Sequence, residues 1–162
     1  MGVLTTVALI IFIVEAQLPP LAPVPGIKLG LANIVSLFAL FWIGRKEAFM
    51  ILLVRIVLGS IFTGQMVVLF YSLAGGLLSF CVIALLYKSF SLDAIWIPSI
   101  LSGLLHNIGQ ITVAVWLTHS VAILAYLPLL VIAGMATGLF TGLCTQFLIK
   151  QKPFLKKPFE GA

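Results

Sequence analysis

Six apolar stretches, separated by short interruptions rich in proline, glycine or charged residues, make up most of the chain. The stretches run from Val3 to Gln17, Leu29 to Gly44, Ala48 to Thr63, Gln65 to Tyr87, Ala94 to Leu117 and Val121 to Ile149. Because a helix needs about 20 residues to cross the hydrocarbon core of a bilayer, this pattern predicts an all-α bundle of six transmembrane helices. The second and third stretches are shorter than that, so these helices would borrow loop residues or lie in a thinned bilayer.

Proline dominates the first interruption and sets it apart from the others. Proline fixes φ and lacks an amide donor, so the segment from Gln17 to Lys28 cannot continue the helix on either side. A stiff loop of this kind between two membrane helices suggests the hypothesis that it forms a lid over a binding pocket. The predicted lid residues are Pro19, Pro20, Pro23, Pro25 and Gly26.

The composition is that of a membrane protein. Of the 162 residues, 62% are hydrophobic and 8% are charged, which is far from the balance of a soluble domain. The net charge of +5 resembles a nucleic-acid signal, but the basic residues lie at the ends of the predicted helices. We therefore expect membrane lipid as a partner and no nucleic acid.

The basic residues also predict the orientation of the bundle. Lysine and arginine favour cytoplasmic loops, and seven of them fall on one side: Arg45, Lys46, Lys88, Lys150, Lys152, Lys156 and Lys157. Both termini would then lie in the cytoplasm, and Lys28 would face outside. The chain is thus predicted to be one six-helix transmembrane domain, residues 1–150, followed by a basic cytoplasmic tail, residues 151–162, that contacts anionic lipid.

Polar groups inside a membrane helix are costly unless they are paired or wetted by a cavity, so they are the first candidates for function. Arg55 lies about two turns into the third stretch from Glu47, too deep to reach the membrane surface easily. Glu15, near the outer end of the first stretch, is the acidic residue that could pair with it. Two hypotheses stay open: a structural ion pair between Glu15 and Arg55, or an Arg55 that binds an anionic ligand.

A polar stripe follows one face of the fifth stretch. Gly103, His106, Asn107 and Gln110 are spaced at i, i+3, i+4 and i+7, which places them on one side of a helix. Their amides and imidazole need hydrogen-bond partners, supplied either by neighbouring helices or by a polar ligand in a cavity. The candidate ligand-binding residues are Lys28, Asn33, Arg55, Gln65, His106, Asn107 and Gln110. No metal site is predicted, apart from the weaker alternative that His106 binds a haem iron.

Small residues recur in the last stretch, where Gly134, Gly138 and Gly142 occupy every fourth position. This spacing lets another helix approach closely. The partner would be a helix of this chain or, as the alternative, a second copy.

Several patterns that mark enzymes are absent from the sequence. It has no Asp-rich cluster to hold magnesium on a diphosphate and no GxxxxGKS/T phosphate loop. No Ser/His/Asp or Cys/His arrangement is recognisable either. We therefore expect no catalytic activity and no cofactor of its own.

The segments LPPLAPVPGIKLGLANIVSLFAL and GRKEAFMILLVRIVLGSIFTG resemble the family of heptaprenyl diphosphate synthase component I, also called the Gx transporter family. The later GLLHNIGQ and the small-residue last stretch fit it too, so the likeness covers most of the chain. That family is similar to the S components of energy-coupling factor (ECF) importers, six-helix bundles with a lid between helices one and two. The resemblance implies a scaffold (T) subunit, two ATPase subunits that hydrolyse ATP, and the plasma membrane of a prokaryote.

Three functions are compatible with these features. The first is an S component that captures a small anionic or amphiphilic solute, such as a vitamin, a porphyrin or a quinone precursor, from the extracellular side. The second is a noncatalytic membrane partner of a polyprenyl (heptaprenyl) diphosphate synthase, acting at the cytoplasmic face. The third is a structural bundle in which the polar stripe only joins helices.

Overall fold

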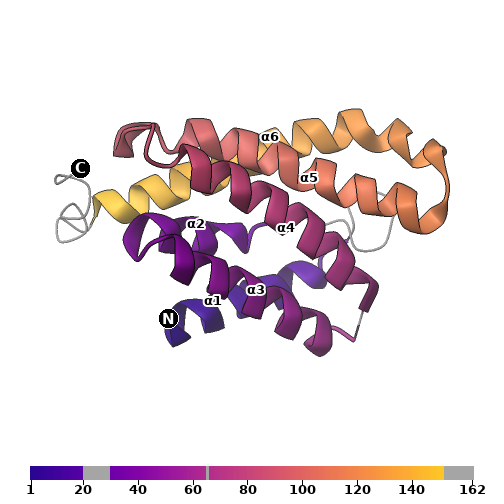
Figure 1. Cartoon of the computed structure of the whole chain (residues 1–162), viewed down its shortest axis with the longest axis horizontal. Coiled ribbons are helices and arrows are strands. Elements are labelled where there is room, and N and C mark those ends of the chain that lie inside the picture. The colour runs from indigo at the N-terminus through magenta and orange to yellow at the C-terminus, as the bar shows by residue number, and fades with distance from the viewer. Residues whose placement is uncertain (20–29, 65, 152–162) are drawn as a thin grey trace.

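A computed structural model describes residues 1–19, 30–64 and 66–151, and in these residues the chain is helical, without β-strands (Figure 1). The elements are α1 (Gly2–Ala16), α2 (Asn33–Trp42), α3 (Arg45–Phe62), α4 (Met66–Leu86), η1 (Leu92–Ala94), α5 (Trp96–Thr118), η2 (Val121–Tyr126) and α6 (Leu127–Lys150). The two η elements are short 3₁₀ helices. Every apolar stretch of the sequence therefore contains an α-helix, which confirms the all-α fold.

Three of the helical segments are long and apolar enough to cross a membrane: α4, α5 and the segment from Val121 to Lys150. The chain is thus a membrane protein. α1 and α2 are apolar but have only 15 and 10 residues. α3 has 18 residues and carries three charged side chains in its first turn. A full set of six crossings stays a prediction.

The start of α3 differs from the predicted one. We expected a helix from Ala48, whereas α3 begins at Arg45 and includes the charged residues before Ala48. Gly44 has φ 133°, a conformation open to glycine, and forms the tight turn between α2 and α3. Glu47 then lies in the first turn of the helix, where the exposed amide groups favour a negative charge.

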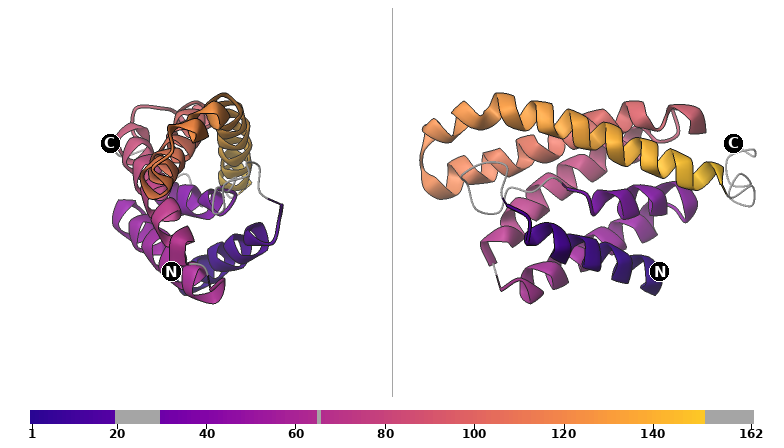
Figure 2. Two further views of the ribbon diagram at one scale, coloured as in Figure 1. Left: turned by 90° about the vertical axis from the view of Figure 1, so that its right-hand side faces the viewer. Right: turned by 180° about the vertical axis from the view of Figure 1, so that it is seen from behind.

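The helices lie roughly side by side along the long axis of the molecule and alternate in direction, so the N-terminus and the end of α6 share one end (Figures 1 and 2). Contacts at this end join distant parts of the chain. The Arg45 guanidinium lies 4.7 Å above the Tyr87 ring, and Lys150 pairs with Asp93 at 2.5 Å. We call it the basic end, because Arg45, Lys46, Lys88 and Lys150 are exposed there.

We describe the bundle as a first half, α1 to α3, and a second half, α4 to α6, which touch where α2 meets α6 and where α3 meets α4 (Figure 2). In the second half, α4 to α6, the central α5 packs closely along both neighbours. Gly103 of α5 touches the backbone of Gly134 and Gly138, and Gly109 touches Ala74 of α4. In the first half, α1 packs on α3 and α2 lies beside α3 and α6. The Gly134, Gly138 and Gly142 stripe therefore packs within this chain.

Between the halves, near the basic end, lies a cluster of buried apolar side chains that we call the basal cluster. It draws on α1, α2, α3, α4 and α6 and on Ile95, the residue before α5. Its buried members include Leu37, Leu40, Ile51, Ile83, Ile95 and Ile149. The polar residues predicted from the sequence lie farther from the basic end than this cluster.

Candidate ligand-binding site

Arg55 is buried in the middle of α3, with 3% of its surface exposed. It is the eleventh residue of the helix, so it lies about 15 Å along the axis from Arg45. Its Nη2 donates a 2.9 Å hydrogen bond to Asn33 Oδ1 of α2, and the guanidinium lies 5.9 Å from the centre of the Phe12 ring. Its Nε has no hydrogen-bond partner among the described residues. One buried donor on a charged group is therefore available.

Glu15, the candidate partner of Arg55, makes a different contact. Its carboxylate accepts a hydrogen bond from the backbone N–H of Gly30 and lies beside the amides of Leu31 and Ala32. These groups begin α2, and the start of a helix attracts negative charge. Among the described residues, Glu15 and Arg55 attract each other but form no direct ion pair. The ion pair considered from the sequence is therefore not formed.

Asn33 connects the two halves of the bundle. Its Oδ1 accepts from Arg55, and its Nδ2 lies 3.4 Å from His106 Nδ1 of α5. The His106 ring fits between two glycines: a methyl group on Gly30 would lie 3.1 Å from His106 Nε2, and one on Gly75 would lie 3.0 Å from Nδ1. We call Arg55, Asn33 and His106 the polar hub. They come from α3, α2 and α5, respectively.

The other polar residues of α5 point to different neighbours. Asn107 donates a 2.7 Å hydrogen bond to the backbone oxygen of Leu130 in α6, while Gln110 packs against Gly75 of α4. The side-chain carbonyl oxygens of Asn107 and Gln110 have no partner among the described residues. The predicted stripe is therefore one helix face, but its members contact different helices. Asn107 and Gln110 line neither pocket described below.

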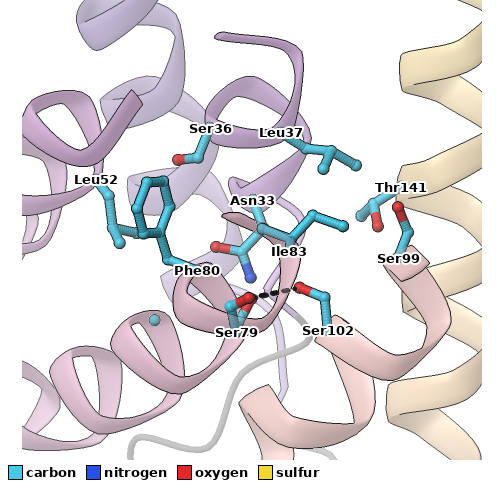
Figure 3. Close-up of a pocket in the computed structure, with 11 residues that line it drawn as sticks. Asn33, Ser36, Leu37, Leu52, Ser79, Phe80, Ile83, Ser99, Ser102 and Thr141 are labelled. Atoms are coloured by element: carbon cyan, nitrogen blue, oxygen red, sulfur yellow. Dashed lines mark hydrogen bonds between the residues drawn. The ribbon is translucent and has the colours of Figure 1, made fainter. Parts of the chain in front are cut away.

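Two adjoining pockets lie between the halves and share Asn33, Ser102 and Thr141. The first, the His106 pocket, has about 230 Å³ of empty space and is lined by Gly30, Asn33, Ser102, Gly103, His106, Thr137, Gly138 and Thr141. The second, the serine pocket, has about 360 Å³ (Figure 3). Its lining consists of Asn33, Ser36, Leu37, Leu52, Gly76, Ser79, Phe80, Ile83, Ser99, Ser102 and Thr141. A water-sized molecule can reach only part of this space, which corresponds to roughly one or two waters.

The basal cluster limits the serine pocket toward the basic end. Leu37 and Ile83 line the pocket and also belong to that cluster. Behind them the cluster continues through Leu40, Ile95 and Ile149. A polar solute in the serine pocket therefore meets apolar side chains in this direction.

Sequence reasoning missed the hydroxyl groups of the serine pocket: Ser36, Ser79, Ser99, Ser102 and Thr141. A signal for two of them was present, because Ser99 and Ser102 precede His106 by seven and four residues and so share its helix face. Serine is a weaker signal than an amide or an imidazole, because a serine hydroxyl in a helix can bond to its own backbone. The pocket shows that hydroxyls extend the polar face of α5.

Several predicted residues lie outside the described part of the chain: Lys28 and Gln65 of the ligand set, and Pro20, Pro23, Pro25 and Gly26 of the lid. Pro19 is described and is exposed after α1. In residues 1–19, 30–64 and 66–151, no group of three or more His, Cys, Asp or Glu side chains could hold a metal ion. A haem iron at His106 stays an untested alternative.

These features define an all-α membrane protein with a buried polar hub and two small pockets between its halves. The chain belongs to the heptaprenyl diphosphate synthase component I family, whose sequence profile matches residues 4–148. Searches of curated proteins and of solved structures gave no match.

Proposed function

We propose that the chain is the solute-binding membrane subunit, or S component, of an ECF-type importer. The observation that carries this proposal is the position of Asn33. It lines both pockets and bonds to the buried Arg55, which itself lines neither pocket, so a solute that enters either pocket meets the polar hub at Asn33. A role in packing alone does not explain the Nε of Arg55 and the hydroxyl of Ser36, which have no hydrogen-bond partner among the described residues.

The pockets suit binding of a solute from one side of the bundle better than its conduction through the bundle. The basal cluster lies between the serine pocket and the basic end, so the polar lining does not continue through the bundle. In the proposed topology of six crossings, the basic end faces the cytoplasm by the positive-inside rule. A solute would then enter from the extracellular side and stop at the basal cluster. Its release would need a scaffold subunit and two ATPase subunits, which hydrolyse ATP while this chain itself is noncatalytic.

Arg55 favours a solute with an acidic group. Glu15 is held by the amides at the start of α2 and does not contact the guanidinium. A carboxylate that replaced the Asn33 oxygen would form a charge-assisted bond with Arg55, which is stronger than a bond between neutral groups. Apolar residues such as Leu52 and Phe80 would hold the rest of an amphiphilic solute. Vitamins and quinone precursors are closer to the pocket size than porphyrins.

Binding also requires the pockets to widen. The reachable space of the serine pocket is only large enough for water-sized molecules, so a vitamin-sized solute must displace water and move helices apart. The second half is held by direct backbone contacts at Gly103 and Gly109. Movement of the first half, and of α2 in particular, is therefore the expected response.

Thermal stabilisation of the purified protein tests the proposal. The panel contains vitamins, naphthoates and porphyrins, and the variants are Asn33→Ala and, as the control, Ser60→Ala, a buried serine outside both pockets. A true ligand at a hundredfold excess over its Kd stabilises by about 2.7 kcal/mol. We expect this stabilisation in the wild type and in Ser60→Ala but not in Asn33→Ala. Failure of every compound, or full stabilisation of Asn33→Ala, would contradict the proposal.

The family match favours a second candidate, a noncatalytic membrane partner of a heptaprenyl diphosphate synthase. The contact surface would be the basic end, where Arg45, Lys46 and Lys88 are exposed. Co-purification of the chain with the catalytic synthase subunit, and a rise in prenyl transfer on mixing, would support it. Charge reversal at Lys46 and Lys88 should abolish that complex and leave solute binding unchanged.

A further inference from the structure

The hydroxyl groups of the serine pocket are oriented by the protein. Ser102 Oγ donates to the backbone oxygen of Ser79 at 3.2 Å. The two side-chain oxygens also lie 2.7 Å apart. Either oxygen can donate across this shorter contact, so the hydrogen of Ser102 goes to the carbonyl or to the hydroxyl of Ser79. In both cases the Ser102 hydrogen is engaged within the protein, and Figure 3 shows the contact between the two hydroxyl groups.

Hydroxyl hydrogens on the opposite wall of the pocket are also bound within the protein. Ser99 Oγ donates to the backbone oxygen of Ile95 at 2.8 Å, and Thr141 Oγ1 donates to that of Gly138 at 3.0 Å. These bonds stay within their own helices, so they do not depend on how the halves pack. Ser99 and Thr141 lie side by side in Figure 3, across the pocket from Phe80.

A hydroxyl group has one hydrogen and two acceptor lone pairs. Ser99, Ser102 and Thr141 therefore present only lone pairs to the pocket. Ser36 is a hydroxyl of this lining whose oxygen has no partner among the described residues. Three of the five hydroxyl groups are thus acceptors only, while the Ser36 hydroxyl and the Nδ2 amide group of Asn33 can donate, and no charged side chain lines the pocket.

From this excess of acceptors we propose that the serine pocket binds a hydrogen-bond donor on the solute, an amine, amide N–H or hydroxyl group, in preference to groups that only accept, such as carboxylates. The inference rests on the proposed function, since it names the part of the solute that lies deepest. An acidic group would stay near Arg55, and the donor would lie beyond Asn33. Leu52 and Phe80 line the same pocket, so the donor would be carried on a ring.

Two isosteric ring compounds test this inference on the purified full chain. The probes are 2-aminopyridine, which carries an N–H donor, and 2-methylpyridine, in which a methyl group replaces the amine. They are titrated at alkaline pH, where both are neutral, with benzoate as the acceptor-only probe and ligand-observed NMR as the readout. Two donated hydrogen bonds should make 2-aminopyridine bind about tenfold more tightly than 2-methylpyridine. Benzoate should bind no better than 2-methylpyridine.

The chain offers a matched pair of serines as variant and control. Ser99 and Ser60 are both buried with 1% exposure and both donate at 2.8 Å to the carbonyl four residues earlier, but Ser60 lines neither pocket. Ser99→Ala removes one acceptor from the pocket, so it should weaken 2-aminopyridine about fivefold. Ser60→Ala should leave the affinity unchanged.

The inference would be overturned if the two pyridines bound equally, if benzoate bound better than 2-aminopyridine, or if 2-aminopyridine did not bind. It would also be overturned if the two serine variants had equal effects. The proposed function is judged separately, by the solute panel and Asn33→Ala. A panel compound that binds through Asn33, combined with no preference for donors, would leave the proposed function standing and reject this inference alone.

Discussion

Asn33 is the residue through which the first half of the bundle is joined to the polar side chains of the second. A buried arginine is strongly destabilising when its partners are removed, because the charge then lies unpaired in a medium of low dielectric. Here Arg55 has Asn33 as its hydrogen-bond partner and Glu15 as a nearby negative charge. Within residues 1–19, 30–64 and 66–151, the Nε of Arg55 has no hydrogen-bond partner, so these contacts do not saturate the guanidinium. At the scale of single residues, the hub is held in place yet still open to one more acceptor.

Gly30 gives a direct test of how tightly the hub is packed. It has φ +80°, and a methyl group there would lie 2.9 Å from Asn33 Nδ2. Gly30→Ala should therefore cost about 1–3 kcal/mol in backbone strain and also displace Asn33 and His106. Gly64 is the matched control, because it has φ +66° with nothing within 4 Å of the added methyl. Melting temperature should fall in both variants, but solute affinity only in Gly30→Ala; an equal loss of affinity would argue against a packed hub.

Glu15 should act mainly as the anion that holds the start of α2. Glu15→Ala leaves the Gly30 N–H without its side-chain acceptor, and we expect a loss of about 1–3 kcal/mol in the free energy of unfolding. Glu15→Gln keeps an oxygen that can accept from Gly30 and should lose less. Denaturant unfolding in detergent measures both. If Gln were as harmful as Ala, the charge on Arg55 rather than the amides would be the main partner.

α5 is the element that brings the polar residues together, and it does so with glycines. Gly103 and Gly109 let its backbone touch α6 and α4, so His106 reaches α2 across a short distance. Because α5 has neighbours on two sides, a single polar face of the helix is shared among several partners. This explains why His106 turns toward Asn33 while Asn107 turns toward the backbone of α6.

An added methyl group on α6 should separate it from α5. At Gly138 it would touch the backbone of Ser99 and Ile100, and overpacking of this kind costs about 1–3 kcal/mol. Gly138→Ala should lower the melting temperature and distort both pockets, since Gly138 lines the His106 pocket. Gly2→Ala is the control, with nothing within 4 Å of the new methyl. Equal melting temperatures for the two variants would show that the α5 and α6 contact is loose.

Much of the arrangement of the helices could be predicted from the sequence. Hydrophobic runs identified every helix, and the small-residue spacing identified the face of α6 that packs. The cost of isolated polar groups in a membrane placed Arg55, Asn33 and His106 in one candidate set, but the sequence did not show that their side chains face one another. The contact of Glu15 with α2 could not be predicted, because it depends on where another helix begins. Ser99 and Ser102 carried a periodic signal, since they share the helix face of His106, whereas the pocket positions of Ser36, Ser79 and Thr141 depend on how the helices pack.

At the scale of the whole molecule, the pockets lie between two halves, and the basal cluster bounds the serine pocket toward the basic end. The basic residues and the arrangement of the termini fit the predicted topology, in which the basic end faces the cytoplasm. Access for a solute would then come from the opposite end, where His119 ends α5 in an exposed turn. This arrangement agrees with the proposed capture of a solute from one side.

Cysteine labelling tests the topology. In a background without Cys81 and Cys144, a membrane-impermeant thiol reagent should label Lys46→Cys only from the cytoplasmic side. The same reagent should label His119→Cys only from the extracellular side. Both positions are exposed in the fold, so burial does not limit the reaction. Labelling of both positions from the same side would contradict the proposed six crossings.

Native mass spectrometry of the chain purified from its own membrane tests the central claim most directly, because it detects a bound solute whatever its chemical identity. The wild type and Ser60→Ala should carry one small molecule per chain, and Asn33→Ala should carry none. A solute site built on the polar hub would be contradicted if all three proteins retained the small molecule equally. It would also be contradicted if none of them carried one, even after incubation with a membrane and cytosol extract.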